Sequence, residues 1–421
     1  PDLVERALKL EAGEPVNLDE WAASRQRLYE TGAFRSVDIQ PEPMTAAQAP
    51  DAPAPAEQPV RAKVTLAEWP AVRLEYGLEI DDQANTASDD ASRATPTSAS
   101  GRNFGLGVAG SVGLRNLFGR AISAGVAARY TNDFQAARLY ATAPTLFGRR
   151  IVTNAFVSLS KEQVGASVQD NNKPFATNTL DFTLEQRLRP APKAEVSYRY
   201  TFGRNHAFEP NPDPDEIIPF DVLARIARLG SALLVDTRND LVDATRGFFH
   251  SSDFEYGVPP LGSDLRFVKY VLQQRYFRRV RGGIVLATAA RVGLATAFDQ
   301  VLLPSERFFT GGGNSVRGYD EDALGPTDIF GVSVGGNALL VLNEEIRFPI
   351  YKWARGVGFF DAGSAFDTVG HLKVNGLPTS TGVGLRLATP IVLLRIDAAW
   401  PLDAAFGPRR TRWFFSIGQM F

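Results

Sequence analysis

From residue 71 onward, apolar and polar residues alternate in segments of about ten residues or more. The first segment has Val72, Leu74, Tyr76, Leu78 and Ile80 on one face, and Arg73, Glu75, Glu79 and Asp81 on the other. Residues 122–131, 180–189 and 195–202 alternate in the same way. Such alternation predicts β-strands with unlike faces. Because strands this long can cross a hydrocarbon layer at a tilt, the pattern predicts a transmembrane β-barrel rather than a soluble sandwich.

The number and spacing of the predicted strands point to the same class. About sixteen strands fit between residues 71 and 421, an even number as in bacterial single-chain barrels. Short turns such as residues 281–283 alternate with long connections such as residues 299–332. Segregated turn lengths are typical of outer-membrane barrels, whose short turns face the periplasm. We therefore predict an all-β transmembrane barrel of 16 antiparallel strands over residues 70–421, in a bacterial-type outer membrane.

Composition excludes several other classes of protein. The mean hydropathy is -0.13, and no apolar run reaches the roughly 18 residues that a membrane-spanning helix needs. A net charge of -2 argues against a nucleic-acid partner. The chain has no cysteine, and its three histidines are scattered, which argues against metal and triad chemistry. Residues 105–110 match G-x-G-x-x-G, but they lie inside a predicted strand, so we expect no cofactor and no enzymatic activity.

Residues 1–69 have a different pattern and predict a small α/β domain. Two helical stripes are followed by two alternating segments, residues 34–40 and 60–66. Asn17 is the expected cap of the second helix, and Gly32 is expected to end it. Residues 41–59 are rich in alanine and proline, which predicts an insertion without a core. The chain starts in a helical pattern with no signal peptide, so we interpret it as a piece of a longer precursor.

The connection Phe308–Pro326 does not have the composition of a solvated loop. Three glycines open it, and then Val316, Arg317, Gly318 and Tyr319 place one cation between apolar and aromatic residues. We expect this segment to fold inward and pack against the barrel wall. A buried guanidinium then requires carboxylates. The next two predicted strands offer Glu345 and, on a face shared with Val357 and Phe359, Asp361.

These segments resemble the BamA/TamA superfamily of outer-membrane protein assembly factors. The resemblance rests on GGGNSVRGYDEDALGP at residues 311–326, GGNALLVLNEEIRFP at 335–349 and GVGFFDAGSAFD at 356–367. It implies an inward-folded loop whose motif arginine is Arg317, with Glu345 and Asp361 as its acidic partners in the lumen. The "LGP" after the motif is similar to TamA. Residues 1–69 resemble a POTRA domain without its first strand, which implies a periplasmic module.

The resemblance implies a protein insertase with a lateral seam between the first and last strands. Unpaired backbone groups are costly in hydrocarbon, so a client strand could replace the seam hydrogen bonds nearly one for one. The aromatic C-terminal segment looks like the β-signal of outer-membrane barrels. The predicted seam residues are Tyr76, Gly77, Leu78, Phe415, Ile417, Gly418 and Phe421. The predicted POTRA edge, which would receive clients or a partner by strand addition, contains Phe34, Val37 and Ile39.

Two other functions have the same predicted fold class. A two-partner-secretion translocator would export an extended polypeptide through the lumen, and a passive porin would only conduct solutes. A porin has no reason for a POTRA domain or an apolar VRGY loop. The expected partners of an insertase are unfolded outer-membrane proteins, the lipid bilayer, and periplasmic or inner-membrane proteins bound through the POTRA domain.

Overall fold

The computed structural model describes residues 2–8, 13–44, 60–82, 104–131, 134–146, 149, 151–164, 175–208, 221–327, 333–388, 393–403 and 410–417. The chain divides into two compact units. One contains residues 1–75, 111–127 and 139–154, and the other contains residues 76–110, 128–138 and 155–421. Within the described ranges, no helix is long and apolar enough to cross a membrane.

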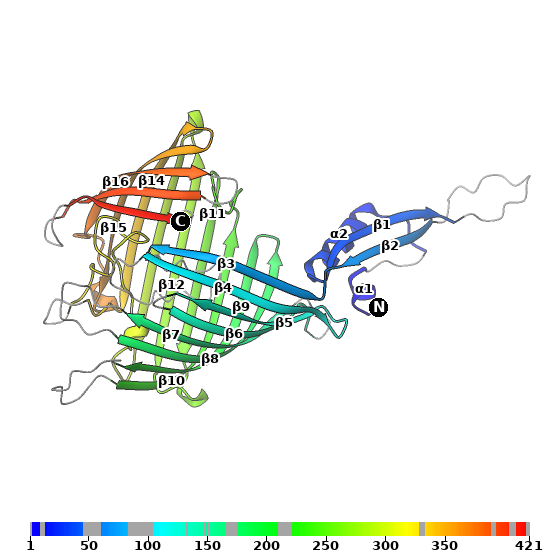
Figure 1. Cartoon of the computed structure of the whole chain (residues 1–421), viewed down its shortest axis with the longest axis horizontal. Helices are drawn as coiled ribbons and strands as arrows, with labels where there is room; N and C mark the ends of the chain where they lie inside the picture. The colour runs from blue at the N-terminus through cyan, green and yellow to red at the C-terminus, as the bar shows by residue number, and fades with distance from the viewer. Residues whose placement is uncertain are drawn as a thin grey trace, which may run out of the picture. The chain divides into compact units, whose positions relative to one another are not determined.

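The N-terminal part of the first unit has the predicted order of two helices and two strands (Figure 1). The Asn17 side chain caps the second helix by accepting hydrogen bonds from the N–H groups of Asp19 and Glu20, at 3.0 and 3.3 Å. Gly32, with φ of 71°, follows the helix end in the left-handed conformation. The elements are α1 (Asp2–Leu8), α2 (Leu18–Glu30), β1 (Phe34–Pro43) and β2 (Val60–Glu68).

Strand β1 pairs antiparallel with β2, and its apolar side chains belong to the core of this part. Phe34 and Val37 are buried, and Ile39 packs against the same cluster. The backbone N–H of Val37 donates to the Tyr29 hydroxyl of α2 at 3.1 Å. Strand addition at β1 would therefore use its backbone groups, because these three side chains already have partners. The predicted insertion at residues 41–59 begins later than expected, since β1 continues to Pro43, and residues 45–59 lie outside the described ranges.

The rest of the chain forms one sheet of 16 strands, as predicted, in which each strand neighbours the next in sequence (Figure 1). The pairs between β8 and β18 are antiparallel. The strands are β3 (Val72–Asp82), β4 (Phe104–Leu117), β5 (Ile122–Tyr130), β6 (Phe134–Ala143), β7 (Val152–Val164), β8 (Phe175–Ala191), β9 (Ala194–Phe208), β10 (Asp221–Asp236), β11 (Gly247–Gly257), β12 (Phe267–Arg279), β13 (Val285–Ala297), β14 (Ala338–Tyr351), β15 (Ala354–Phe366), β16 (Thr379–Ala388), β17 (Leu393–Pro401) and β18 (Arg412–Ile417).

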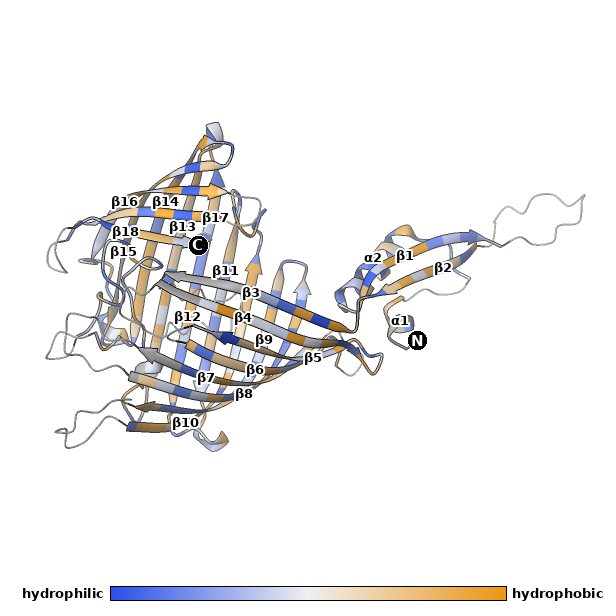
Figure 2. Ribbon diagram, viewed as in Figure 1, coloured by the Kyte–Doolittle hydropathy of each residue, from blue (hydrophilic) through white to orange (hydrophobic). Residues whose placement is uncertain are grey.

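The two faces of the sheet have the opposite polarity to those of a soluble protein. On β8, Phe182 and Leu184 are 41% and 40% exposed, whereas Thr183 between them is 5% exposed and Glu185 after them is 2% exposed. On β9, Tyr198 is 56% exposed, and the adjacent Arg199 is 5% exposed. Figure 2 shows hydrophilic and hydrophobic residues alternating along the strands. On these strands the alternation in the sequence therefore places polar side chains on the buried face and apolar side chains on the exposed face.

Several predicted connections can be compared directly with the structure. The turn at residues 281–283 is the short 3₁₀ segment η2 (Arg281–Gly283), between β12 and β13. The G-x-G-x-x-G match at residues 105–110 lies within β4, the strand context that argued against a dinucleotide site. The long connections predicted at 82–103, 161–176 and 204–225 fall mostly outside the described residues.

The predicted seam strands, β3 and β18, are the two ends of the strand order. Tyr76 on β3 is 88% exposed, and Phe415 on β18 is 49% exposed. Gly418 and Phe421 lie outside the described residues, as do the side chains of Leu78 and Ile417. Gly77 has open space where a Cβ atom would lie. Closure of the seam by pairing of β3 with β18 stays a prediction.

Candidate functional site

The connection between β13 and β14, residues 298–337, contains the motif singled out in the sequence and is called the inner loop below. It folds back on itself, because Phe308 and Gly336 exchange two backbone hydrogen bonds of 2.7 Å. Gly311 and Gly312 have φ of 122° and 87°, where a side chain would be strained and would also collide with neighbouring loop atoms. The glycines thus permit a tight fold that carries the next residues against the sheet.

Arg317 is fully buried and is bound by three carboxylates from three different strands. Its Nε and Nη2 atoms donate to the two oxygens of Asp361 on β15, at 2.7 and 2.8 Å. Its Nη1 donates to Glu345 Oε1 on β14 at 2.8 Å, and to Asp397 Oδ2 on β17 at 3.1 Å. The Asp361 contact is bidentate, the geometry in which a planar guanidinium binds a carboxylate most strongly. The two acids predicted from the sequence are brought to Arg317, together with a third that was not predicted.

One face of β15 carries both apolar residues and Asp361, and this mixture has a physical explanation in the site. The Arg317 guanidinium carbon lies 3.4 Å from the centroid of the Phe359 ring. Phe359 is 4% exposed and therefore shares the buried face with Asp361. An aromatic ring packed on a buried guanidinium is a cation–π contact. An apolar residue thus belongs on this face, which made the expected assignment of Asp361 difficult to read from alternation.

Three further arginines surround the same acids. Arg347 Nη2 lies 2.8 Å from Glu345 Oε2, and Arg386 Nη1 lies 2.5 Å from Asp397 Oδ1. Arg395 lies 3.5 Å from Asp397 and donates to the Gly313 carbonyl of the inner loop at 2.9 Å. Arg386 also reaches Glu345, at 3.1 Å. The group is called the Arg317 cluster below and contains Arg317, Arg347, Arg386, Arg395, Glu345, Asp361 and Asp397.

The residues beside Arg317 fix its position. Val316 is fully buried in a hydrophobic cluster. Gly318 has φ of 94°, and an added Cβ would lie 3.2 Å from the Pro401 nitrogen, so both backbone conformation and space favour glycine. The Tyr319 hydroxyl donates to the Thr379 carbonyl at 2.8 Å. All four residues of the predicted motif therefore contact the sheet or the core.

The surroundings favour the charged form of Arg317 and disfavour the charged form of Asp322. Burial disfavours the charged guanidinium, but the carboxylates of Asp361, Glu345 and Asp397 outweigh this effect, so the pKa of Arg317 lies above its ordinary value. Asp322, also in the inner loop, is in the opposite situation. Burial raises the pKa of Asp322 to about 7, and its Oδ2 atom has no hydrogen-bond partner. Asp322 thus changes charge near neutral pH inside the folded loop.

A second ionic group lies at the base of the inner loop and was not predicted from the sequence. Glu306, at the end of the 3₁₀ segment η3 (Pro304–Glu306), is 2% exposed. Its carboxylate lies 3.2 Å from Arg228 Nη2 on β10 and 3.2 Å from Lys269 Nζ on β12. The group is called the Glu306 cluster below and contains Glu306, Arg228, Lys269, Arg199, Asp253 and Glu255.

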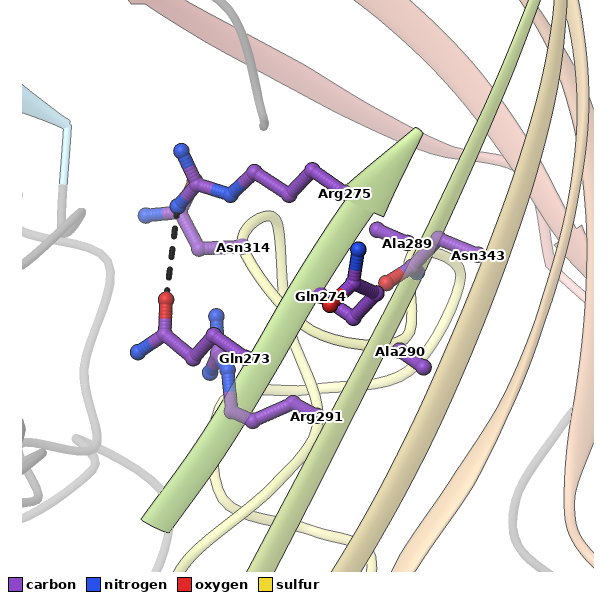
Figure 3. A pocket seen from close by; sticks show the side chains of 8 residues that line it. All are labelled: Gln273, Gln274, Arg275, Ala289, Ala290, Arg291, Asn314 and Asn343. Carbon is purple, nitrogen blue, oxygen red and sulfur yellow. Dashed lines mark hydrogen bonds between the residues drawn. The ribbon is translucent and has the colours of Figure 1, made fainter. Parts of the chain in front are cut away.

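A polar pocket separates the tip of the inner loop from strands β12 and β13 (Figure 3). In Figure 3 the side chains of Gln273, Arg275 and Arg291 extend to the same side as Asn314 of the loop. Arg275 Nη2 donates to Gln273 Oε1 at 3.5 Å. The lining contains two guanidinium groups and no carboxylate, so this pocket is not suited to a metal cation. In the part of the chain that the structure describes, no group of three or more histidine or acidic residues could hold a metal.

Comparison with known families agrees with this arrangement. The Omp85 superfamily domain matches residues 116–421, which include the sheet from the end of β4, the inner loop and both ionic clusters. The chain belongs to the Omp85 superfamily. The resemblance of its motifs to BamA and TamA is thereby confirmed at the level of the superfamily, while the leaning toward TamA stays a prediction.

Two curated relatives have the name outer membrane protein assembly factor BamA. The protein from Nitratidesulfovibrio vulgaris is 26% identical over 327 residues, which is 76% of this chain and 40% of that protein. The protein from Neisseria meningitidis serogroup B is 28% identical over 212 residues, 42% of this chain and 26% of that protein. This Omp85 chain therefore spans less than half the length of either relative.

Solved structures show the same fold at low sequence identity. BamA from Haemophilus ducreyi lacking POTRA domains 1–3 matches with a TM-score of 0.78 and 14% identity, over 99% of this chain and 81% of that one. CdiB from Acinetobacter baumannii matches with a TM-score of 0.59 and 15% identity, over 99% of this chain and 71% of that one.

Some site residues of this Omp85 chain were missed for an identifiable reason. Arg395 and Asp397 share one face of β17 with Leu393 and Ala399, so a charged pair on an otherwise apolar strand face was the available signal. Glu306 is followed by Arg307 and two phenylalanines, and this local sequence does not distinguish it from a solvent-exposed acid in a loop. Its burial depends on strands β10 and β12, which lie far away in sequence, and no local pattern reports that.

Proposed function

We propose that this chain is part of an outer-membrane protein assembly factor that folds or inserts client β-barrel proteins. The observation that carries the proposal is the buried Arg317 cluster, built by an inner loop on a sheet whose apolar side chains face outward. Membership of the Omp85 superfamily and similarity to proteins named as assembly factors support the same conclusion. Client proteins and periplasmic or inner-membrane partners of the whole protein belong to this proposal.

The outward apolar face supports placement in a bilayer. Exposed aromatic and aliphatic side chains such as Phe182, Tyr198 and Phe360 would be costly in water and are stable against lipid. Buried charges such as Glu185 and Arg199 would be shielded from the hydrocarbon. We infer that the sheet closes into a transmembrane barrel in the outer membrane, with the α/β part of residues 1–69 as a POTRA domain in the periplasm.

Client insertion would use the two strands at the ends of the sheet order. A closed seam between β3 and β18 satisfies backbone groups that each cost several kcal/mol if left unpaired in hydrocarbon. An incoming client strand offers the same kind of hydrogen bonds, so exchange at the seam needs no ATP. Gly77 weakens β3 and is a candidate site of opening, because glycine reduces side-chain packing within a strand.

Arg317 would keep the wall on the β18 side of the seam in shape during this exchange. Its carboxylate partners lie on β14, β15 and β17, and β17 pairs directly with the seam strand β18. Strand β1 would receive clients or a partner through the backbone edge that β2 does not pair.

The test is a disulfide across the seam, which is practical because the chain has no native cysteine. We would replace Tyr76 and Ile417 by cysteine, oxidise the pair, and measure assembly of a client barrel in vesicles. A control pair, Glu344→Cys with Phe360→Cys, joins registered residues of β14 and β15 on the exposed face. Loss of assembly with the locked seam alone, and recovery on reduction, is the expected result. Full assembly with a locked seam would contradict lateral opening.

The same experiment tests a second candidate, polypeptide export of the two-partner-secretion type. The fold likeness to CdiB is the observation that favours it. An exporter that moves an extended client through its lumen would remain active with the seam locked. A passive porin would show a steady conductance in planar bilayers that Arg317→Ala does not change.

A further inference from the structure

The base of the inner loop carries a buried acid that no part of the proposed function uses. Glu306 is 2% exposed and accepts ionic contacts from both Arg228 and Lys269, each at 3.2 Å. Lys269 is itself 2% exposed, and its ammonium group lies 5.3 Å from the centroid of the Phe308 ring. Removal of this buried carboxylate is costly, because Lys269 then loses its described ion pair and Arg228 loses one of its two.

The cations that hold Glu306 are fixed by further acids on neighbouring strands. Arg228 also contacts Glu255 Oε2 at 3.3 Å, and Glu255 accepts from Arg199 at 2.7 Å. Arg199 contacts Asp253 at 2.5 Å. The Glu306 cluster thus contains three cations and three acids, of which only Glu306 comes from the loop. The wall of β9–β12 is therefore a prepared cationic seat for one loop carboxylate.

The two clusters bind the inner loop with opposite polarity. At Glu306 the loop supplies the acid and the wall supplies the cations, whereas at Arg317 the loop supplies the cation and the wall supplies the acids. A loop docked in the reverse sense would place Glu306 near the carboxylates and Arg317 near Arg228 and Lys269. Like charges brought together in this way are strongly unfavourable, so the arrangement selects one orientation.

We propose that Glu306 is a positioning residue, the second anchor of the inner loop, which orients the loop so that Arg317 reaches its three acids. The proposal rests on the inner loop having the role given to it under the proposed function, but its geometry can be tested alone. Glu306 holds the loop to β10 and β12, and Arg317 holds it to β14, β15 and β17. The loop is thereby a tie between two parts of the sheet.

The experiment uses a cysteine reporter inside the loop. Thr310 lies between the two anchors, is 1% exposed, and its hydroxyl has no hydrogen-bond partner, so Thr310→Cys removes no bond. A second reporter, Ser158→Cys on β7, is 3% exposed and remote in sequence from both anchors. The maleimide labelling rate of each reporter is measured in the full chain in lipid vesicles, in otherwise unchanged protein and in anchor variants.

Glu306→Gln is expected to raise the labelling rate at position 310 by about tenfold, because loss of the anchor makes local opening more frequent. Labelling at position 158 should stay unchanged. Lys269→Gln leaves Glu306 paired with Arg228 and should give a smaller rise. It also carries the test if Glu306→Gln does not fold. Glu344→Gln, an exposed carboxylate beside Glu345 that bonds Thr288, is the matched control and should change neither reporter.

Two results would overturn the proposal. One is a labelling rate at position 310 within twofold of the control, and the other is an equal rise at positions 310 and 158, which indicates global destabilisation. Combining Glu306→Gln with Arg317→Gln should raise the rate at position 310 by less than the product of the two separate effects, because Glu306 acts by positioning Arg317 and the two contacts are coupled. Labelling requires no client protein, so failure of client assembly and failure of the anchor are distinguishable.

Discussion

The Arg317 cluster and the Glu306 cluster both join the inner loop to the sheet through buried ion pairs, but they differ in charge balance. The Arg317 cluster has four arginines and three carboxylates, whereas the Glu306 cluster has three cations and three carboxylates. In the first cluster the loop residue Arg317 touches all three acids, whereas Arg386 on the wall touches two of them. In the second, Glu306 touches two cations and the wall pairs the rest among itself.

The difference shows which cluster depends on the loop. Without Arg317, Asp361 keeps only the Asn343 amide among its described side-chain partners. Without Glu306, Arg228 keeps Glu255, although Lys269 loses its only described ion pair. We therefore expect the Arg317 cluster to be the stronger anchor and the Glu306 cluster to be the one that sets orientation.

The largest expected effect is that of Arg317→Gln, which leaves buried carboxylates without their shared cation. We expect a loss of roughly 3–5 kcal/mol in the free energy of unfolding, as for other broken buried ion pairs. Urea unfolding in vesicles, followed by tryptophan fluorescence, measures it. Arg199→Gln is the matched change in the Glu306 cluster, and it should leave labelling at position 310 unchanged because Arg199 does not touch the loop. Equal loop exposure in both variants would remove the distinction between the clusters.

Asp397→Asn should have the next largest effect, because the Arg317 cluster already has more arginines than acids. The change leaves two carboxylates for four arginines and removes the shortest contact of Arg386. We expect the free energy of unfolding to fall by roughly 3 kcal/mol. Asp253→Asn in the Glu306 cluster should cost less, since Arg199 retains Glu255 at 2.7 Å. The same unfolding measurement ranks the two variants. A larger loss for Asp253→Asn would mean that charge balance does not decide the difference.

Asp322 offers a pH test of a loop acid that, unlike Glu306, has no cationic seat. Burial raises the pKa of Asp322 to about 7 from its ordinary value of 3.8. The folded state then binds the proton more tightly, so its stability is retained below about pH 4 and falls as the pH rises through 7. Asp322→Asn keeps the left-handed backbone, where φ is 58°, and removes the charge. At pH 8 the variant should be roughly 1–3 kcal/mol more stable than the unchanged chain, and at pH 4 equally stable. A pH-independent difference would contradict the assignment.

The smallest expected effect separates backbone strain from crowding at the Arg317 motif. Gly318→Ala places a Cβ atom 3.2 Å from backbone atoms of Trp400 and Pro401, in addition to the strain of φ at 94°. Gly282→Ala in the exposed turn has similar strain, with φ of 72°, and open space around the new atom. Backbone strain should lower the free energy of unfolding of both variants by about 1–2 kcal/mol. Gly318→Ala should lose more and should also speed labelling at position 310. Identical behaviour of the two variants would show that the motif glycine is required for conformation alone.

The sequence alone determined the class of the molecule. Alternation with a period of two over long segments specifies strands with unlike faces. Successive side chains of any β-strand point to opposite faces of the sheet, so this inference does not depend on how the strands pair. It predicted a 16-stranded sheet, which the structure contains. The local sequence also predicted the inward position of Arg317, because the apolar Val316 and the aromatic Tyr319 on either side of it favour packing against the sheet over exposure to water. Its need for acids then followed from the cost of burying a charge.

Tertiary structure alone decided which acids and cations meet. Asp397 lies 80 residues from Arg317 in sequence, and their contact depends on the register of β14, β15, β16 and β17 and on the turn of the glycine-opened loop. The seat of Glu306 depends in the same way on β10 and β12. Phe359 was ambiguous by alternation because its partners on the buried face, the Arg317 guanidinium and Ala399 of β17, belong to elements distant in sequence. Pairing across strands brings distant residues to one point, and a local pattern contains no information about that distance.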